Sequence, residues 1–501
     1  MYSVEPLDTH NRELLKHVHP ENWQNPRPTG PYNLVVIGGG TAGLVSAAGA
    51  ASLGAKVALI ERSLMGGDCL NTGCVPSKAV IRSGRAAHDI RAASHFGIQS
   101  QIEAIDFAAA MGRMRQVRAQ ISHHDSFERF KNLGIDVYMG SARFINDRQL
   151  EVGGQTLDFK KAVIASGARA RVPEIPGLAE AGYLTNENVF NLTALPQRLV
   201  CIGGGPIGCE LAQAFHRLGA QVTLIHNSDH LLNREDPDAA AVVQAQFLKE
   251  GIQLILNAEL TGVAQSAAGK TVSYRIAGQS YQIVADAILL ATGRQPNVEK
   301  MGLEAAGVRF QPQGVEVNDH LQTSNPRIFA AGDVCMRWQF THAADFAARI
   351  VLQNALFMGR KKLSSLLMPW CTYTDPEVAH VGLYAHEAKA QGIAVDIYQK
   401  PFAEVDRALA DGETEGFVKV LTAKGSDRIL GATVVARHAG DMLGELTLAI
   451  QHNIGLGKIA SVIHPYPTQA EAIRHLGDQY NRTRLKPWVK NLFEIWLRWQ
   501  R

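Results

Sequence analysis

The chain of 501 residues is long enough for three or four domains, and its 46% apolar and 19% charged composition is typical of a globular protein. A net charge of +3, with no basic run that alternates with aromatic residues, excludes a nucleic-acid binder. The sequence contains no run of about 18 apolar residues, so it predicts no membrane span. Six cysteines are too few for a secreted disulfide scaffold, and the polar residues 1–30 lack the apolar core of a signal peptide, so we expect a reducing, cytoplasmic location.

The first elements after this polar extension predict a dinucleotide-binding unit. The sequence YNLVVIGGGTAG predicts a strand, a turn with Gly38, Gly40 and Gly43 in GxGxxG spacing, and a helix. Such glycines let a pyrophosphate approach the helix N-terminus. The next predicted strand, KVALIE, ends in Glu61, about 20 residues further on, where a carboxylate accepts a hydrogen bond from a ribose hydroxyl.

The stretch GGDCLNTGCVPSK then sets Cys69 and Cys74 five positions apart in a Gly-rich segment, with Lys78 one helical turn beyond. A disulfide needs Cα atoms about 4.4 to 6.8 Å apart, and five residues of ideal helix are too long for it. We therefore expect Cys69 on a turn and Cys74 at a helix N-terminus, where unpaired N–H groups favour a thiolate. The pair predicts redox exchange, with Cys74 as the stabilised thiolate and Cys69 as the outer, exchanging sulfur.

The middle of the first half predicts helices at about 79–91 and 107–133 and a strand at 135–145. A β-rich passage follows and ends in KKAVIASGARA, residues 160–170. Pro173, Pro176 and Gly177 then predict a connection into a second unit.

This second unit repeats the fingerprint. The sequence LVCIGGGPIGCE carries Gly203, Gly205 and Gly208, and the strand QVTLIH that follows ends in His226 and Asn227. A carboxylate at this place binds the ribose of NADH and repels a 2′-phosphate, whereas a neutral or basic end tolerates NADPH. The coenzyme therefore stays open between NADPH and NADH, with NADPH favoured.

The last third predicts a return to the first domain and then a new one. SNPRIFAAGDV places a strand and Asp333 before an apolar helical run, so the first domain resumes after the second has been inserted. From about Pro369, strands such as EGFVKVL and ILGATVVA surround helices without another nucleotide fingerprint.

These motifs together resemble the pyridine nucleotide-disulfide oxidoreductases, the flavoprotein family of dihydrolipoamide dehydrogenase, glutathione reductase and mercuric reductase. The resemblance covers residues 31 to about 480, through both glycine fingerprints and GGDCLNTGCVPSK, ASGARA, ATGRQPN, FAAGDV and YTDPEVAHVG. It implies an α/β fold with two Rossmann-like domains, of which the NAD(P)H domain is inserted into the FAD domain, and an α+β C-terminal dimerisation domain. The implied parts are a polar extension (1–30), the FAD domain (31–178 and 299–368), the NAD(P)H domain (179–298), the dimerisation domain (369–480) and a tail (481–501). The active site would be shared between two identical subunits.

The resemblance also implies roles for individual residues and no bound metal. FAD would contact Gly38, Gly40, Gly43, Glu61, Gly67, Asp68, Lys78, Gly140, Ser166, Gly167 and Asp333. NADPH or NADH would contact Gly203, Gly205, Gly208, His226, Asn227 and Gly293. Lys78 and Glu210 resemble the ion pair beside the flavin. Electrons would pass from NAD(P)H through FAD to Cys74, and the dithiol would reduce a substrate through Cys69.

One segment departs from the lipoamide and glutathione enzymes, in which a histidine with a glutamate five residues later serves as general acid and base. In HPYPTQAE, alignment on Pro467 puts Tyr466 at the histidine's position and Glu471 at the glutamate's, with His464 two residues too early. A tyrosine with a pKa near 10 is a poor proton shuttle at neutral pH. Tyrosine here is typical of mercuric reductases, although the chain ends without their terminal cysteine pair and begins without a CxxC metal domain.

The sequence therefore predicts an FAD-dependent NAD(P)H oxidoreductase that reduces a soft metal ion, as mercuric reductases do, or a small electrophile. A dihydrolipoamide dehydrogenase-like enzyme is the alternative of the same class. A flavin-based redox sensor docked on a membrane or partner is the alternative outside enzymes.

The tail carries apolar residues at helical spacing, Leu485, Trp488, Val489, Leu492, Phe493 and Trp496, flanked by Lys486, Lys490, Arg498 and Arg501. Contact with an anionic membrane surface and packing on the dimer explain this pattern equally well.

Overall fold

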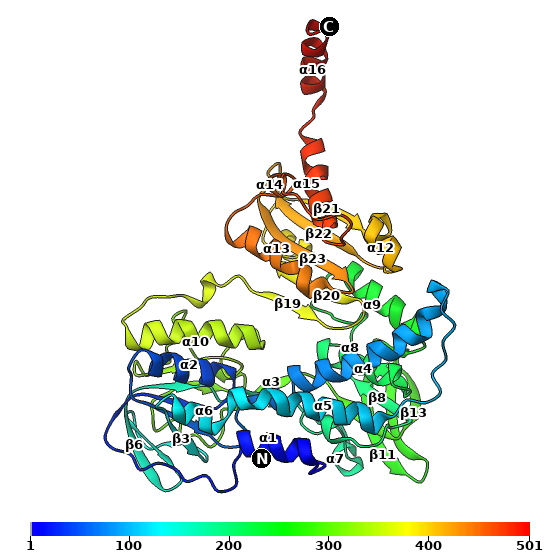
Figure 1. Ribbon diagram of the computed structural model, residues 1–501. Coiled ribbons are helices and arrows are strands. Elements are labelled where there is room, and N and C mark those ends of the chain that lie inside the picture. Colours follow the sequence, from blue (N-terminus) through cyan, green and yellow to red (C-terminus); the bar gives the residue numbers. More distant parts are fainter. Residues whose placement is uncertain (1–2) are drawn as a thin grey trace. The chain divides into compact units, whose positions relative to one another are not determined.

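The computed structural model describes residues 3–501 and divides the chain into two compact units (Figure 1). The first unit contains residues up to Ala92, Ser100–Asn227 and Asn257–Leu366. The second contains Ala93–Gln99, Ser228–Leu256 and Leu367–Arg501. Within residues 3–501, no helix is long and apolar enough to cross a bilayer.

A seven-stranded sheet organises the first part of the first unit. Its strand order is β3-β2-β1-β6-β5-β4, and β18 pairs with β6 outside this path. The pairs among β1, β2, β3, β6 and β18 are parallel, whereas β4, β5 and β6 form an antiparallel extension. The strands are β1 (Tyr32–Ile37), β2 (Val57–Glu61), β3 (Asp136–Met139), β4 (Arg143–Phe144), β5 (Gln149–Val152), β6 (Gln155–Ile164) and β18 (Ile328–Ala330). Because β18 pairs in parallel with β6, the predicted return of the chain to the first domain is confirmed.

A second parallel sheet in this unit carries the second fingerprint. Its strands within this unit are β9 (Gln221–Ile225), β8 (Arg198–Ile202) and β14 (Ala287–Leu290), in the order β9-β8-β14. The remaining strands are the antiparallel set β11 (Glu259–Ser266), β12 (Gly269–Ile276) and β13 (Gln279–Ala285), the pair β7 (Ala168–Ala170) and β15 (Arg294–Pro296), and the pair β16 (Phe310–Gln311) and β17 (Gly314–Val315). Two parallel βαβ sheets in one chain confirm the predicted pair of Rossmann-like folds.

Helices of the first unit surround these sheets and position the cysteines. They are α1 (Thr9–Val18), α2 (Thr41–Ser52), α3 (Gly67–Asn71), α4 (Cys74–Ala92), α5 (Phe107–Ser122), α6 (Phe127–Asn132), α7 (Leu178–Ala181), α8 (Pro206–Arg217) and α10 (Thr341–Leu356). Helix α4 packs against α5 and α8, and α10 packs against α2. At Gly84 of α4, an added Cβ would lie 3.1 Å from the Ala214 carbonyl oxygen of α8, so the two helices approach closely.

Three local predictions differ from the structure. Cys69 lies in the short helix α3 and not on a turn, because Thr72 and Gly73 separate α3 from α4 and so relieve the spacing problem of a single helix. The helix predicted at 107–133 is broken at Ser126, whose extended backbone and side chain cap α6. The strand predicted at 135–145 is two strands, since the chain turns after Gly140, where φ is +146°.

The N-terminal extension is folded, which the sequence did not indicate. Asp8 caps α1 and accepts a hydrogen bond from Arg115 Nε at 2.5 Å. Leu14 and Val18 are fully buried, and α1 packs against α5. Arg118 connects this helix to the cysteine segment, because it donates to Asn11 Oδ1 and to the carbonyl oxygen of Asn71.

The second unit is built on a five-stranded antiparallel sheet with the order β19-β20-β23-β22-β21. These strands are β19 (Pro369–Thr372), β20 (Glu377–Gly382), β21 (Val395–Pro401), β22 (Phe417–Ala423) and β23 (Ile429–Ala436). Its other elements are α9 (Pro237–Glu250), β10 (Gln253–Ile255), α11 (Ala385–Ala390), α12 (Asp406–Asp411), α13 (Ala439–Gln451), α14 (Leu456–Ile459), α15 (Glu471–Thr483) and α16 (Pro487–Trp499). Helix α13 covers β20 and β23, and residues of α13, α14 and α15 share one apolar core with the sheet.

Candidate active site

The two cysteines lie on consecutive helices and are both free thiols. Cys69 is half-buried in α3, and Cys74 is exposed at the first residue of α4. Pro76 follows in the first turn of α4, where backbone N–H groups have no partner within the helix, so proline loses no hydrogen bond there. Gly67 brings this segment against the first glycine loop, because an added Cβ there would lie 2.6 Å from the Cα of Gly40.

The surroundings of the pair give the two sulfurs opposite acidities. A hydrogen bond from Cys69, assisted by one from Thr341 and by the charge of Lys78, lowers the pKa of Cys74 to about 6 against the effect of burial. The same bond to Cys74, together with burial, raises the pKa of Cys69. At neutral pH, Cys74 is therefore a thiolate and Cys69 a thiol that donates to it.

Thr341 is a site residue that the sequence reasoning missed. Its Oγ1 lies 3.4 Å from the Cys74 sulfur, and it is the first residue of α10. Its position shortly after the FAAGDV motif, at the predicted start of a helix, was the available signal.

Lys78 and Glu210 lie together as the resemblance implied. Lys78 Nζ is 2.7 Å from Glu210 Oε2, and the Glu210 side chain is only 7% exposed. The pair forms because Lys78 lies one turn into α4 and Glu210 lies on α8, against which α4 packs. The buried carboxylate holds the ammonium group near Cys74, so its positive charge favours the thiolate.

Asp68 and Asp333 are joined by Arg294, which the sequence reasoning also missed. Arg294 lies 2.6 Å from Asp68 Oδ2 and 3.2 Å from Asp333 Oδ2. Asn186 also donates to Asp68, at 3.0 Å, and Thr72 donates to the same carboxylate. Burial raises the pKa of Asp333. The guanidinium group thus connects the cysteine segment with the β18 end of the first sheet.

The first glycine loop has the geometry of a phosphate-binding turn. Gly38 has φ +112°, and an added Cβ would lie 2.2 Å from the Ala165 carbonyl oxygen, while one at Gly43 would lie 1.8 Å from the Gly38 carbonyl oxygen. Gly40 is the N-cap of α2 and carries no side chain that could occupy the helix N-terminus. The buried Glu61 carboxylate accepts from the backbone N–H of Gly39 at 2.6 Å, and burial raises its pKa.

The second loop repeats this geometry with a histidine in place of the acid. An added Cβ at Gly203 would lie 2.3 Å from the Ala291 carbonyl oxygen, and one at Gly208 would lie 1.9 Å from the Gly203 carbonyl oxygen. Gly205 is the N-cap of α8. His226 Nδ1 accepts from Gly204 N–H at 3.1 Å, as Glu61 does from Gly39. Asn227 follows it and is exposed.

The other predicted cofactor residues lie at turns of the same unit. Gly140 N–H donates to the Glu61 carbonyl oxygen. Ser166 donates to the Asn297 carbonyl oxygen at 2.8 Å, and Gly167, at φ +67°, precedes β7. Gly293, at φ +104°, precedes β15, the partner of β7.

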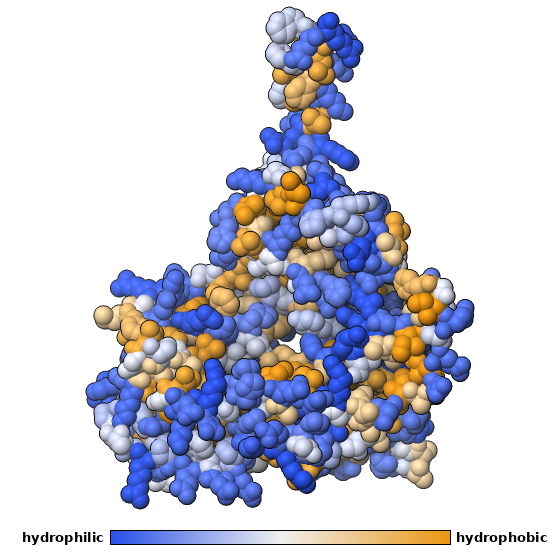
Figure 2. All heavy atoms as spheres, in the orientation of Figure 1, coloured by the Kyte–Doolittle hydropathy of each residue, from blue (hydrophilic) through white to orange (hydrophobic). Residues whose placement is uncertain are grey.

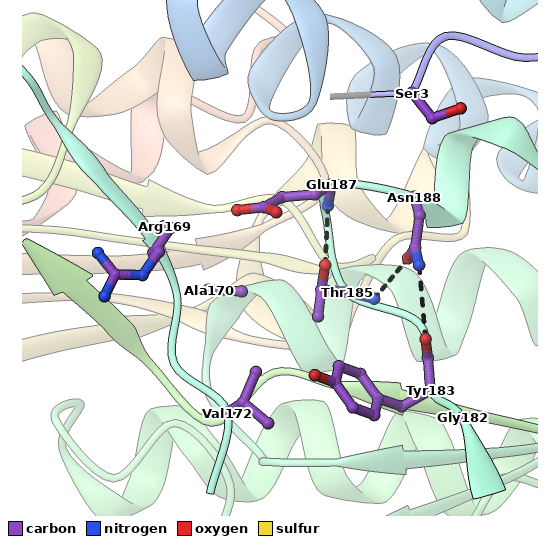
Figure 3. A pocket seen from close by; sticks show the side chains of 9 residues that line it. All are labelled: Ser3, Arg169, Ala170, Val172, Gly182, Tyr183, Thr185, Glu187 and Asn188. Carbon is purple, nitrogen blue, oxygen red and sulfur yellow. Dashed lines mark hydrogen bonds between the residues drawn. The ribbon is translucent and has the colours of Figure 1, made fainter. Parts of the chain in front are cut away.

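A cavity of about 520 Å³ opens beside β7 and the connection that follows it (Figure 3). Figure 3 shows Glu187, Thr185 and Asn188 on one side and Arg169 on the other. Burial raises the pKa of Glu187. None of the residues that line this cavity was predicted as a site residue, and Arg169 is already paired with Glu299 at 2.8 Å.

The three candidate acid and base residues lie in the second unit. Tyr466 is 69% exposed and donates a hydrogen bond to Asp406 at 3.1 Å, which raises the pKa of the tyrosine. Glu471 pairs with Arg474 at 2.8 Å. Both ring nitrogens of the largely buried His464 face acceptors, Nε2 the Glu445 carboxylate at 3.0 Å and Nδ1 the Val462 carbonyl oxygen.

Comparison with known proteins agrees with this geometry. Residues 32–348 match the family described as pyridine nucleotide-disulphide oxidoreductase, and residues 368–476 match its dimerisation domain. The chain belongs to the pyridine nucleotide-disulphide oxidoreductase family. Members of this family use FAD and NAD(P)H, and the dimerisation domain supports a homodimer.

The relatives within this family include both mercuric reductases and dihydrolipoyl dehydrogenases. A mercuric reductase of Staphylococcus aureus is 37% identical over 89% of this chain and 82% of its own length. A dihydrolipoyl dehydrogenase of Bacillus subtilis is 34% identical over 88% of this chain and 96% of its own length. Among solved structures, the HOCl-induced flavoprotein disulfide reductase RclA from Escherichia coli aligns with a TM-score of 0.81 and 28% identity, and the alignment covers 89% of this chain and 99% of RclA. A Cu(II) complex of RclA aligns with a TM-score of 0.80. Family membership therefore supports an oxidoreductase and leaves its substrate open.

Proposed function

We propose that this protein is an NAD(P)H-dependent flavoenzyme that cycles a Cys69–Cys74 disulfide and reduces a soft metal ion, with Hg(II) as the substrate to test. The observation that carries the proposal is a thiolate and a thiol on adjacent helices, since two such sulfurs are preferred ligands of soft metal ions. One NAD(P)H and one Hg(II) give NAD(P)⁺, one proton and Hg(0), so two electrons balance the reaction. The mercuric reductase relatives and the Cu(II) complex of RclA support this substrate class.

FAD would be held by the first glycine loop together with Glu61, the Gly67 turn and Asp333. The loop has no room for a Cβ at Gly38 or Gly43, and it leads directly into the N-terminus of α2, where a pyrophosphate can bind. Bound FAD would supply two-electron transfer between NAD(P)H and the cysteine pair. The chain's own contribution lies in the sulfurs: Lys78 and Thr341 keep Cys74 ionised, and Cys69 retains its proton until substrate binds.

Tyr466 favours a metal substrate over a disulfide substrate. Reduction of a disulfide needs a group that gives a proton to the leaving thiolate, whereas Hg(II) needs none. The raised pKa of Tyr466 keeps its hydroxyl protonated, so near neutral pH this group is too weak an acid to give up that proton. His464 is a weak candidate for this role because both of its nitrogens already face acceptors.

We further propose that NADPH is the preferred coenzyme, bound by the second glycine loop with Asn227 and Gly293. His226 occupies the position of Glu61 relative to its loop but carries no negative charge to repel a 2′-phosphate. Residues 31–178 and 299–368 would form the FAD domain, 179–298 the NAD(P)H domain and 369–480 the dimerisation domain, in a homodimer that shares its active site. A cytoplasmic location would suit a disulfide that opens and closes.

The test is NADPH oxidation by the holoenzyme with Hg(II) and excess thiol. We expect Cys69→Ser and Cys74→Ser each to lower turnover by roughly a hundredfold or more, since single removal of a catalytic nucleophile has effects of this order. Cys371→Ser, which changes a half-buried cysteine of the second unit, is the matched control. Equal turnover of wild type and both variants would show that the disulfide does not carry the reaction. Rapid turnover would also exclude a protein whose flavin only senses NAD(P)H.

A dihydrolipoamide dehydrogenase is the second candidate, because a relative with that activity matches over 96% of its own length. Lipoamide-dependent turnover with NAD⁺ that exceeds Hg(II) turnover would favour it over the metal reductase.

A further inference from the structure

The C-terminal helix α16 has an unusually broad apolar surface. At 100° per residue, its eight apolar side chains fill one continuous arc of about 200°, and its polar side chains fill the remainder. The apolar set is Trp488, Val489, Leu492, Phe493, Ile495, Trp496, Leu497 and Trp499. A helix that packs on a protein core needs an apolar stripe of only about 100°. The arc is wide enough for a helix half immersed in an apolar medium.

This surface is uncovered within the described chain. No residue of α16 is buried, and Trp488 and Trp499 are 66% and 77% exposed. Figure 2 shows hydrophobic side chains of this helix at the surface beside charged ones. Exposed apolar patches of this kind mark sites of interaction with proteins or membranes.

The charge of the tail identifies the kind of partner. Residues 481–501 contain six arginines and lysines and one glutamate, a net charge of +5. Because the whole chain carries only +3, the other 480 residues sum to −2. Lys490 and Arg498 lie on the polar arc of α16, where they would face the headgroups of an anionic bilayer while the opposite arc enters it.

The tryptophan content of α16 also indicates a membrane as the partner. Three of the six tryptophans of the chain lie in this one helix, and tryptophan is enriched at the boundary between lipid and water. The tail also lies beyond residue 476, where the family match ends, so the common fold does not require it.

We propose that α16 docks the enzyme on an anionic lipid bilayer, with the helix lying in the plane of the membrane surface. The basic residues of the tail, 481–501, give selectivity for acidic headgroups, and the apolar arc of α16 inserts into the boundary region. This attachment is independent of the cysteine chemistry, and NADPH turnover therefore does not depend on it.

The experiment is flotation of the full-length holoenzyme with vesicles of phosphatidylcholine alone or mixed with phosphatidylglycerol. We expect at least roughly tenfold more protein to float with the mixed vesicles than with phosphatidylcholine, because surface attraction rises with each basic residue. A chain ending at Tyr480 should lose this binding while keeping its NADPH turnover. Leu492→Asp should weaken binding as well. Leu248→Asp should not, since Leu248 is about equally exposed, 60% against 56%, but lies on α9.

Equal flotation of the full chain and the chain ending at Tyr480 would overturn the proposal. A second combination of results would also overturn the proposal: no vesicle binding, together with a change of oligomeric state on truncation, measured by light scattering without lipid. In that case α16 would pack on a second copy of the chain. A shift of tryptophan fluorescence to shorter wavelength on addition of the mixed vesicles, lost in the truncated chain, would place α16 itself in the lipid.

Discussion

Replacing Thr341 with valine should raise the pKa of the Cys74 thiol without disturbing the fold. Valine has nearly the same shape as threonine, and Thr341 is the half-buried first residue of α10. The change therefore removes mainly one hydroxyl, whose oxygen lies 3.4 Å from the Cys74 sulfur and whose hydrogen bond lowers its pKa.

The size of the effect follows from the strength of this contact. A hydrogen bond to a charged group contributes about 1.5 to 3 kcal/mol, and a shift of one pKa unit corresponds to about 1.4 kcal/mol. Because the contact is long, we take the lower end and expect the pKa to rise from about 6 to about 7. A higher pKa delays ionisation as the pH rises. The variant should therefore carry less thiolate between about pH 5.5 and 7.5 and the same amount above about pH 8.5.

Iodoacetamide labelling of the reduced holoenzyme, with Cys74 quantified by peptide mass, measures this fraction across the pH range. Near pH 6.5 the variant should label roughly threefold more slowly than wild type, since only the thiolate reacts. Thr447→Val is the matched control, because Thr447 is also half-buried on a helix but bonds to the Leu443 carbonyl oxygen. Superimposable pH profiles for Thr341→Val and wild type would refute the assignment of the hydroxyl as a stabiliser of the thiolate.

Three further changes test other parts of the site. His226→Glu should lower kcat/KM for NADPH at least roughly tenfold relative to NADH, because a carboxylate beside Gly204 would repel a 2′-phosphate; an unchanged ratio would remove His226 from coenzyme selection. Tyr466→His should raise lipoamide turnover at least roughly tenfold by supplying a group that titrates near neutral pH, and no gain would show that proton transfer is not what limits that substrate. Leu14→Ala should lower the free energy of unfolding, measured by urea denaturation, by about 2 to 4 kcal/mol, because Leu14 is fully buried in α1. The control Leu53→Ala, at a 62% exposed position, should change the free energy of unfolding by less than about 0.5 kcal/mol. Equal stabilities of these two leucine variants would contradict the docking of α1.

Local backbone geometry made much of this protein readable from its sequence. Both glycine fingerprints were found because each requirement, a positive φ at Gly38 or Gly203 and a close approach at Gly43 or Gly208, falls within a few residues. Strand β23 coincides with the segment ILGATVVA for the same reason, since its run of apolar and β-branched residues is a local pattern. The spacing of the cysteines likewise placed Cys74 at a helix N-terminus, although it missed the separate helix α3.

By itself, the sequence thus determined the two nucleotide-binding units, the insertion of one into the other and the reactive pair Cys69 and Cys74. The tertiary structure decided which charges and hydroxyls surround that pair. Arg294, Asp333 and Thr341 are far from the cysteines along the chain. Only the pairing of β15 with β7, the pairing of β18 with β6 and the placement of α10 bring these three residues to the cysteine segment. The physical reason is that a backbone turn depends on its own few residues, whereas the partner of a buried charge depends on how helices and strands distant in sequence pack.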